Sequence, residues 1–149
     1  RDPRGWSLST CYLALLPACQ EVENEQLAFF DLADVVERRV LLPFDHNLLA
    51  RRAHERLAAK SVYSSLPLYL LDTRFTVLDA LGAMQACLGQ PVNATSLRKR
   101  LERLRVLGWV KDTGEKNQPP MGRPQQLYQY TAQGQGPFMF DRSLLPEGS

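Results

Sequence analysis

Apolar residues in the second half of the chain recur with the period of a helix. Val77, Leu81, Met84 and Leu88 follow one another at intervals of three or four residues, so they share one helical face. Gly89 comes directly after the last of them, and glycine often ends a helix because it adopts a left-handed backbone without steric cost. The pattern predicts a helix that ends at about residue 88.

Capping residues mark the start of this helix and of the next one. Thr76 and Asp79 stand in the positions of a capping box, with Asp in place of the usual Glu. Pro91 prevents the first helix from continuing, and Asn93 is well placed to cap the second. We therefore expect a turn of only a few residues between the two helices.

The second helix has an apolar face and a basic face. Leu97, Leu101 and Leu104 share the apolar face, and Gly108 provides the stop. At about 100° per residue, the following residues point away from the leucines or lie on their flank: Arg98, Lys99, Glu102, Arg103 and Arg105.

A strand, a loop and a return strand are predicted after the second helix. Residues 109–111 begin the first strand, and residues 127–130 form the second. Residues 112–126, between them, are rich in glycine, proline and polar residues, which is typical of a loop. Residues 74–75 supply a small strand before the two helices.

The first half of the chain mixes strand and helix patterns. Residues 6–16 and 27–30 are rich in aromatic and aliphatic side chains, and we predict both as strands of one sheet. The period becomes helical after Asp45, a plausible N-cap, and predicts a helix over residues 46–60 with its arginines in solvent. Residues 61–71 fit another short helix that contains a proline.

Helix, short turn, basic helix, strand, loop and strand is the order of elements in a winged helix-turn-helix. Either the helix over residues 46–60 or the one near residues 63–70 would supply the first helix of that motif. The predicted fold class is therefore α+β, with the winged helix-turn-helix in the second half of the chain.

Charge is divided unevenly between the two halves. Residues 1–72 hold 8 Lys+Arg and 10 Asp+Glu, a net charge of −2, whereas residues 73–149 hold 10 and 6, a net charge of +4. Most of the basic surplus lies between Arg98 and Arg123. Such asymmetry suggests a polyanionic partner, and for a winged helix-turn-helix that partner is double-stranded DNA.

Several other classes of protein are disfavoured. No apolar run approaches the roughly 20 residues that span a bilayer, and no signal peptide is expected. The three cysteines form no C-x-x-C pair, and no histidine stands at a spacing that would complete a zinc site. We expect a cytoplasmic protein with no membrane partner and no metal, whose cysteines are buried as small hydrophobic residues.

The predicted DNA-binding site lies on the second helix, because an α-helix fits the major groove of B-DNA. Arg98 and Lys99 are candidates for base or phosphate contact, and Arg103 and Arg105 are candidates for phosphate. Hydroxyl and amide groups beside the duplex would come from Asn93, Thr95 and Ser96. The alternative is a charged, solvated helix face without a ligand.

The loop between the two strands presents a further candidate, Arg123. Gly122 and Pro124 flank it and hold it on a short, stiff segment, a form that suits a narrow minor groove with its enhanced negative potential. The alternative is an arginine in a flexible loop. The basic helix, the capped turn and this loop together favour DNA binding more than any one of them does alone.

Blocks of the sequence resemble known protein families. GRPQQLYQYTAQG is similar to the wing ending G-R-P-x-x-x-Y-x-x-T-x-x-G of several families of bacterial winged-helix repressors. FTVLDALGAMQACLGQPVNATSLRKRLERLRVLGWVKDTGEK, together with GRPQQLYQY, resembles the carboxy-terminal domain of the Nudix-related transcriptional regulators of NAD biosynthesis. FDHNLLARRAHERLAAKSVYSSLPLYLL and, more loosely, RDPRGWSLSTCYLALLP and NEQLAFFDLADV extend this resemblance over most of the chain.

These regulators join an amino-terminal Nudix-like domain, which binds ADP-ribose or a related nucleotide, to a winged helix that holds operator DNA as a dimer. The resemblance implies that residues 1–60 are a partial Nudix-like sensor domain, made of its later strands and closing helix. It implies that residues 61–149 are a winged helix-turn-helix DNA-binding domain. The expected function is a homodimeric repressor of NAD-metabolism genes, with ADP-ribose as an effector and no required cofactor.

Two other functions remain open. The Nudix signature, a glycine followed by a glutamate-rich helix with R-E-x-x-E-E, does not occur in the sequence, so we expect no enzyme. A Nudix-type ADP-ribose pyrophosphatase with an accessory winged helix would need several carboxylates that converge on magnesium, whereas Glu21, Glu23 and Glu25 are spaced by two. The other alternative is a protein-interaction module, since winged helices also bind protein.

Overall fold

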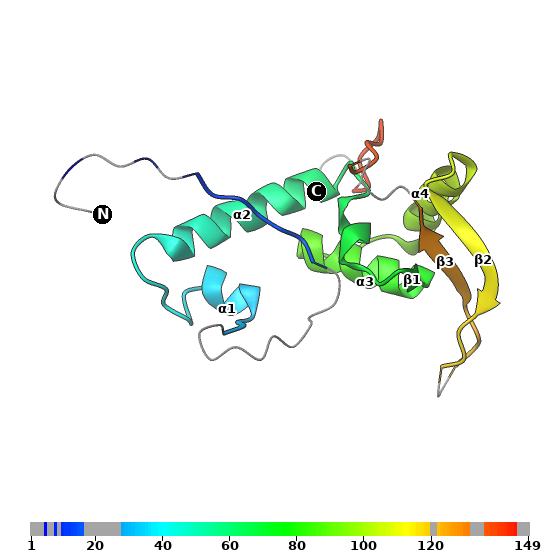
Figure 1. Ribbon diagram of the computed structural model, residues 1–149, viewed down its shortest axis with the longest axis horizontal. Coiled ribbons are helices and arrows are strands. Elements are labelled where there is room, and N and C mark those ends of the chain that lie inside the picture. Colours follow the sequence, from blue (N-terminus) through cyan, green and yellow to red (C-terminus); the bar gives the residue numbers. More distant parts are fainter. Residues whose placement is uncertain are drawn as a thin grey trace.

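The computed structural model describes residues 5, 8, 10–16, 28–119, 122–131 and 136–145. Its elements, in chain order, are α1 (Leu32–Val36), α2 (His46–Ser61), the 3₁₀-helix η1 (Leu66–Leu70), β1 (Arg74–Phe75), α3 (Val77–Leu88), α4 (Ala94–Val106), β2 (Val110–Lys116) and β3 (Gln126–Tyr130). Figure 1 shows α1 and most of α2 on one side of the molecule, with α4 and the strands on the other.

The predicted pair of capped helices is confirmed as α3 and α4. The Thr76 hydroxyl accepts a hydrogen bond from the Asp79 backbone N–H, and the Asp79 carboxylate accepts one from the Thr76 N–H. Gly89 ends α3 with a φ of 66°, in the left-handed region. The Asn93 side-chain oxygen caps α4 by accepting from the backbone N–H groups two and three residues further on, at 2.9 and 3.1 Å.

The three strands form one antiparallel sheet in the order β1–β3–β2. Phe75 of β1 pairs with Tyr128 of β3. β1 has the predicted bounds, but β2 extends to Lys116 and β3 begins at Gln126, so the connecting loop is shorter than predicted. Most of β2 is exposed, so apolar alternation does not mark its polar residues as a strand.

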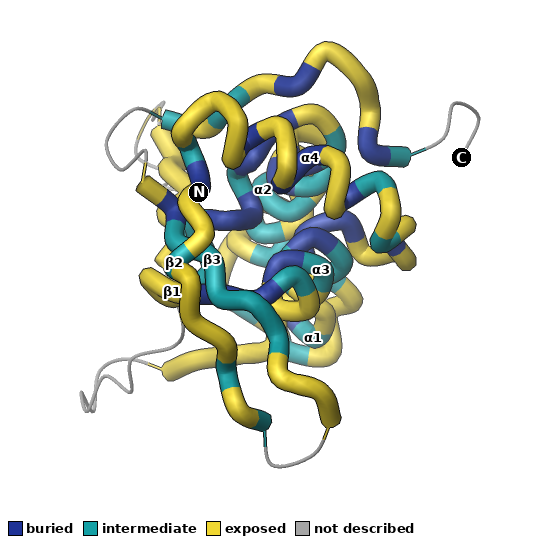
Figure 2. Tube along the Cα trace, turned by 90° about the vertical axis from the view of Figure 1, so that its right-hand side faces the viewer, coloured by how far each residue is buried: buried dark blue, intermediate teal, exposed yellow. Residues whose placement is uncertain are grey.

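The hydrophobic core lies between α3, α4 and the sheet, and Figure 2 shows buried positions on α3 and α4. Leu97, Leu101 and Leu104, which were predicted to share the apolar face of α4, are all buried in it. Phe75 of β1 and Met84 of α3 belong to the same core. Burying a leucine or phenylalanine side chain contributes roughly 1.5–3 kcal/mol, so this apolar face accounts for the position of α4.

The two strands predicted in the first half of the chain are not found. Of the predicted segments, residues 8, 10–16 and 28–30 are described, and none of them is in a strand. An isolated strand would leave its backbone N–H and C=O groups unpaired, and the described sheet contains only β1, β2 and β3. Residues 10–16 lie along α2 instead (Figure 1), so the strand prediction is wrong there.

The predicted long helix of the first half is confirmed as α2, while α1 is a short helix that the sequence pattern does not predict. Asp45 occupies the N-cap position of α2 without a side-chain hydrogen bond to the helix. Asn47 donates to the carbonyls of Val35 and Val40 at 2.8 and 2.7 Å, and accepts from the Leu42 N–H at 2.8 Å. These bonds fix α1 and the following loop against the start of α2. The short helix expected after α2 is η1.

The last described residues, 136–145, pack back onto the helices, and we call them the C-terminal segment. The N–H of Phe140 donates to the Tyr63 carbonyl at 2.6 Å, and the N–H of Leu144 donates to the Val62 carbonyl at 2.9 Å. Phe140 and Leu144 also belong to the hydrophobic core. The C-terminal segment therefore connects the end of α2 with the core around α4.

The cysteines have different environments. Cys87 is buried, as predicted, and burial raises the pKa of its thiol. Cys11 is exposed, contrary to the prediction, because its segment lies on the surface; Cys19 lies outside the described residues. Among the described residues, no three His, Cys, Asp or Glu side chains come together in a way that could hold a metal ion. Nor is any helix within the described ranges long and apolar enough to cross a membrane.

Candidate nucleic-acid interface

Helix α4 leaves the side opposite its leucines open to solvent. Thr95, Arg98 and Lys99 are exposed on this side, as the helical spacing predicted, whereas Ser96 is half-buried. Neither Arg98 nor Lys99 forms an ion pair or a side-chain hydrogen bond with the part of the chain that the structure describes. Two cations on a rigid helix are therefore available to phosphates or base edges.

Asn93 has its two polar side-chain atoms in different roles. The side-chain oxygen is engaged in capping α4, where it accepts two backbone N–H groups. The amide nitrogen has no hydrogen bond to any described residue, and Asn93 is exposed. The NH₂ group is therefore free to donate to a ligand while the oxygen holds the helix.

Arg105 is held by Glu102, one turn earlier on α4. Nε and Nη2 of Arg105 donate to the two carboxylate oxygens at 2.9 and 2.6 Å. This hydrogen bonding lowers the pKa of Glu102 and raises the pKa of Arg105, so both remain charged at neutral pH. The charge of Asp112, in β2, also raises the pKa of Arg105, as expected for an arginine on the flank of α4 nearer the sheet.

Arg103 lies on the other flank of α4, beside the C-terminal segment. Its Nη2 donates to the Asp141 carboxylate at 2.8 Å, and its guanidinium lies 5.7 Å from the centre of the Phe138 ring. The hydrogen bond from Arg103 lowers the pKa of Asp141. Both side chains are exposed to solvent, which screens their attraction, so Arg103 can exchange the carboxylate for a phosphate at little cost.

Arg100 is buried, with 8% exposure, and was not among the predicted site residues. Its Nη2 donates to the carbonyls of Val62 and Arg142 at 2.7 and 2.6 Å, and its guanidinium carbon lies 4.3 Å from the centre of the Phe140 ring. Burial lowers the pKa of Arg100 to about 10, so it is still a cation at neutral pH. Its position, three residues after one core leucine and four before another, was the signal that could have revealed its burial.

The wing consists of β2, β3 and the residues that join them, and Figure 1 shows it extending beyond the helices. Gly122 has a φ of 104°, and Arg123, which follows it, is exposed. The Asn117 N–H donates to the Gln125 carbonyl at 2.9 Å, so the two sides of the wing remain paired beyond the strands. The predicted site residues therefore fall on two elements, α4 with its cap and the wing.

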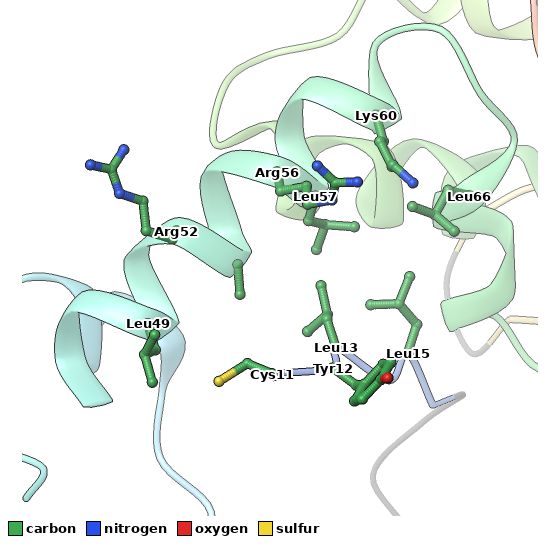
Figure 3. Close-up of a pocket in the computed structure, with 11 residues that line it drawn as sticks. Cys11, Tyr12, Leu13, Leu15, Leu49, Arg52, Arg56, Leu57, Lys60 and Leu66 are labelled. Carbon is green, nitrogen blue, oxygen red and sulfur yellow. The ribbon is translucent and has the colours of Figure 1, made fainter. Parts of the chain in front are cut away.

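A groove of about 480 Å³ lies between α2 and residues 11–15. Figure 3 shows Leu13 and Leu15 pointing toward the helix, where Leu57 lies. Cationic side chains of α2 also line the groove: Arg52, Arg56 and Lys60. An apolar floor with cations beside it suits a ligand that carries both an apolar part and negative charge.

Part of the chain matches a known family. Residues 67–130 match the family described as the NrtR DNA-binding winged helix domain. They run from η1 to the end of β3 and include both α4 and the wing. The second half of the chain therefore resembles a winged helix domain of the NrtR type.

Similar proteins extend the match beyond that domain. The chain is 30% identical over 150 residues to the ADPR responsive transcriptional repressor NtrR of Acinetobacter baylyi, in an alignment that covers 97% of this chain and 56% of that protein. The chain thus spans little more than half the length of this relative.

Two solved structures of Shewanella oneidensis NrtR are also similar. A crystal structure of that protein has a TM-score of 0.80 and 35% identity, over 96% of this chain and 64% of the other. A crystal structure of its complex with a 27mer DNA has a TM-score of 0.64 and 34% identity, over 76% of this chain and 49% of the other.

Proposed function

We propose that this protein is a DNA-binding transcriptional regulator, a repressor of NAD-metabolism genes that responds to ADP-ribose or a related nucleotide. The observation that carries the proposal is the exposed face of α4, where Arg98 and Lys99 have no partner among the described residues. Two similar proteins support it, since one is named as an ADPR responsive transcriptional repressor and the other was crystallised with DNA.

In the proposed complex, α4 enters the major groove and the wing follows the adjacent backbone. Arg98 and Lys99 contact bases or phosphates, while Arg105 binds phosphate on the flank that faces the sheet. Arg103 exchanges Asp141 for a phosphate. The remaining contacts come from Asn93, Thr95 and Ser96 at the start of α4 and from Arg123 in the minor groove.

The proposal assigns the two parts of the chain different tasks. Residues 61–149 form the winged helix-turn-helix domain, and residues 1–60 form part of a Nudix-like sensor domain that includes all of α2 except its last residue. Operators with two-fold symmetry are bound by dimers, so we expect the protein to bind as a homodimer in the cytoplasm. ADP-ribose acts as an effector, and the protein is a regulator that needs no cofactor and no metal.

Fluorescence anisotropy with duplex fragments selected from the source genome tests this function. We expect selective binding that weakens steeply between about 50 and 200 mM salt, because each neutralised phosphate releases counterions. Added ADP-ribose should shift the affinity for the selected fragment. A non-selected duplex of equal length is the control for general attraction to DNA.

Other outcomes would favour other functions. Selective binding that ADP-ribose leaves unchanged would retain the regulator and remove the proposed effector. Absent or salt-insensitive binding would favour a protein-interaction module. Release of AMP from ADP-ribose and magnesium above a protein-free blank would favour the pyrophosphatase.

A further inference from the structure

A second cationic surface lies beside α4, on the flank away from the sheet. A pocket of about 370 Å³ opens there between α4 and the C-terminal segment. Figure 2 shows the chain after the sheet passing over α4 toward the carboxyl terminus, with the strands on the other side of the helix. The charged residues that line this pocket are four cations and one carboxylate: Lys99, Arg100, Arg103, Arg142 and Asp141.

The charges in this pocket do not balance within the described chain. Asp141 compensates Arg103 through the 2.8 Å ion pair. The hydrogen bonds that Arg100 donates go to backbone carbonyls, which carry no net charge. Lys99 and Arg142 have no carboxylate partner among the described residues. The pocket therefore retains a positive charge of about three, which favours an anionic occupant.

Arg100 adds an unpaired hydrogen-bond donor. Its Nη1 is buried and has no hydrogen-bond partner in the described chain. The residue as a whole is 8% exposed. Leaving a buried donor unpaired is unfavourable, and more so when the group is charged. Arg100 lines the pocket and carries a charge that no described carboxylate balances, so an anion in the pocket would lower the cost of burying that charge.

We propose that this pocket binds a phosphate group, which the backbone of the bound duplex supplies. Lys99 lines the pocket and also belongs to the exposed face of α4, so the two surfaces are continuous. A helix in the major groove has a sugar–phosphate backbone on each side. Arg105 and the wing face one backbone, and the pocket faces the other. This assignment rests on the proposed DNA binding.

Substitution of Arg142 tests the pocket. Arg142→Ala removes an exposed side chain but keeps the carbonyl that accepts from Arg100, so thermal melting should show an unchanged fold. In anisotropy titrations over a salt series, the slope of log K against log salt should fall by about 1, equally for selected and non-selected duplexes. Asp141→Asn should act in the opposite direction and tighten binding, because it removes the negative charge of the pocket.

A matched control and a second probe separate the sources of phosphate. Arg51→Ala makes the same change in charge at an exposed position of α2 and should leave the salt slope unchanged. Inorganic phosphate, added at constant ionic strength, should raise the melting temperature of the wild type but not of Arg142→Ala, since a ligand that binds the folded state stabilises it.

Each outcome has a definite meaning. A reduced salt slope in Arg142→Ala supports a backbone phosphate. An unchanged slope with a phosphate-dependent melting shift that Arg142→Ala abolishes would support a free phosphate instead. If Arg142→Ala changes neither the salt slope nor the phosphate-dependent shift in melting temperature, the proposed phosphate site is wrong, even if the protein binds DNA. If the wild type binds no DNA, the proposed function fails, and the melting shift alone decides whether the pocket binds phosphate.

Discussion

At the scale of single residues, neighbouring cations on α4 have different surroundings. Arg98 and Lys99 are exposed without described partners, Arg103 and Arg105 each hold a carboxylate, and Arg100 is buried. A cation that already holds a carboxylate gains less from a phosphate, because it must give up one partner for the other. We therefore expect Arg98 and Lys99 to contribute most to DNA affinity.

The double substitution Arg98→Glu and Lys99→Glu tests this expectation. A specific contact of this kind is worth about 1–3 kcal/mol, so the double variant should bind the selected duplex at least about tenfold more weakly. The slope of log K against log salt should also fall by about 2, because two phosphate-neutralising groups are lost. Anisotropy titrations over the same salt series measure both quantities.

A control variant separates the site from overall charge. Arg38→Glu and Arg51→Glu make the same change in net charge at exposed positions before and within α2. This variant should bind nearly as tightly as the wild type. Equal losses of affinity in the two double variants would mean that total charge, and no particular face of α4, controls binding.

At the scale of elements, the cap of α4 joins stability to recognition through one side chain. The Asn93 oxygen satisfies two backbone N–H groups at the start of the helix, while its NH₂ group faces solvent. An aspartate at this position keeps an oxygen for the cap and lacks the donor. The two roles of Asn93 can therefore be measured separately.

We expect Asn93→Ala to lower the free energy of unfolding by about 1 kcal/mol, the usual contribution of an N-cap side chain. Asn93→Asp should keep the wild-type stability in the same urea titration, because carboxylate oxygens also cap a helix. It should nevertheless bind DNA more weakly, since it loses the donor and adds a negative charge beside the duplex. If both variants lost equal stability, the side-chain oxygen would not be the group that caps α4.

At the scale of the whole molecule, the C-terminal segment links parts of the chain that are far apart in sequence. It pairs with Val62 and Tyr63 after α2, packs Phe140 into the core and surrounds the guanidinium of Arg100 on α4. The position of α4 thus depends on residues at the end of the chain. Substitutions that weaken this link should therefore lower the stability of the entire winged helix domain.

Phe140→Ala tests the link, because Phe140 is 8% exposed and belongs to the core. We expect the free energy of unfolding to fall by about 3–5 kcal/mol, as is usual when a buried phenylalanine is truncated. Met139→Ala is the matched control, since Met139 is the preceding residue and is 53% exposed. Chemical denaturation should show a change within about 0.5 kcal/mol for the control. Similar losses in both variants would contradict the packing described for the segment.

Features that depend on interactions between residues close together in the chain could be predicted from local pattern alone. The capping box of Thr76 and Asp79, the Asn93 cap and the stop at Gly89 each involve residues at most four apart. The leucine face of α4 follows from helical periodicity in the same way. Local hydrogen bonding and side-chain period were sufficient for α3, α4 and the exposure of Arg98 and Lys99. The DNA contacts themselves remain predictions.

Features that depend on partners distant in sequence became apparent only in the folded protein. Residues 10–16 have the composition of a strand, but a strand forms only where its backbone N–H and C=O groups are hydrogen-bonded to a neighbouring strand. No described strand pairs with them. Arg103 and Arg105 were both predicted to bind phosphate, yet Arg103 pairs with Asp141, 38 residues away. Arg100 lies between carbonyls of Val62 and Arg142 that no spacing rule connects. Folding brings these groups together through the common core, so their pairing cannot be read from local pattern.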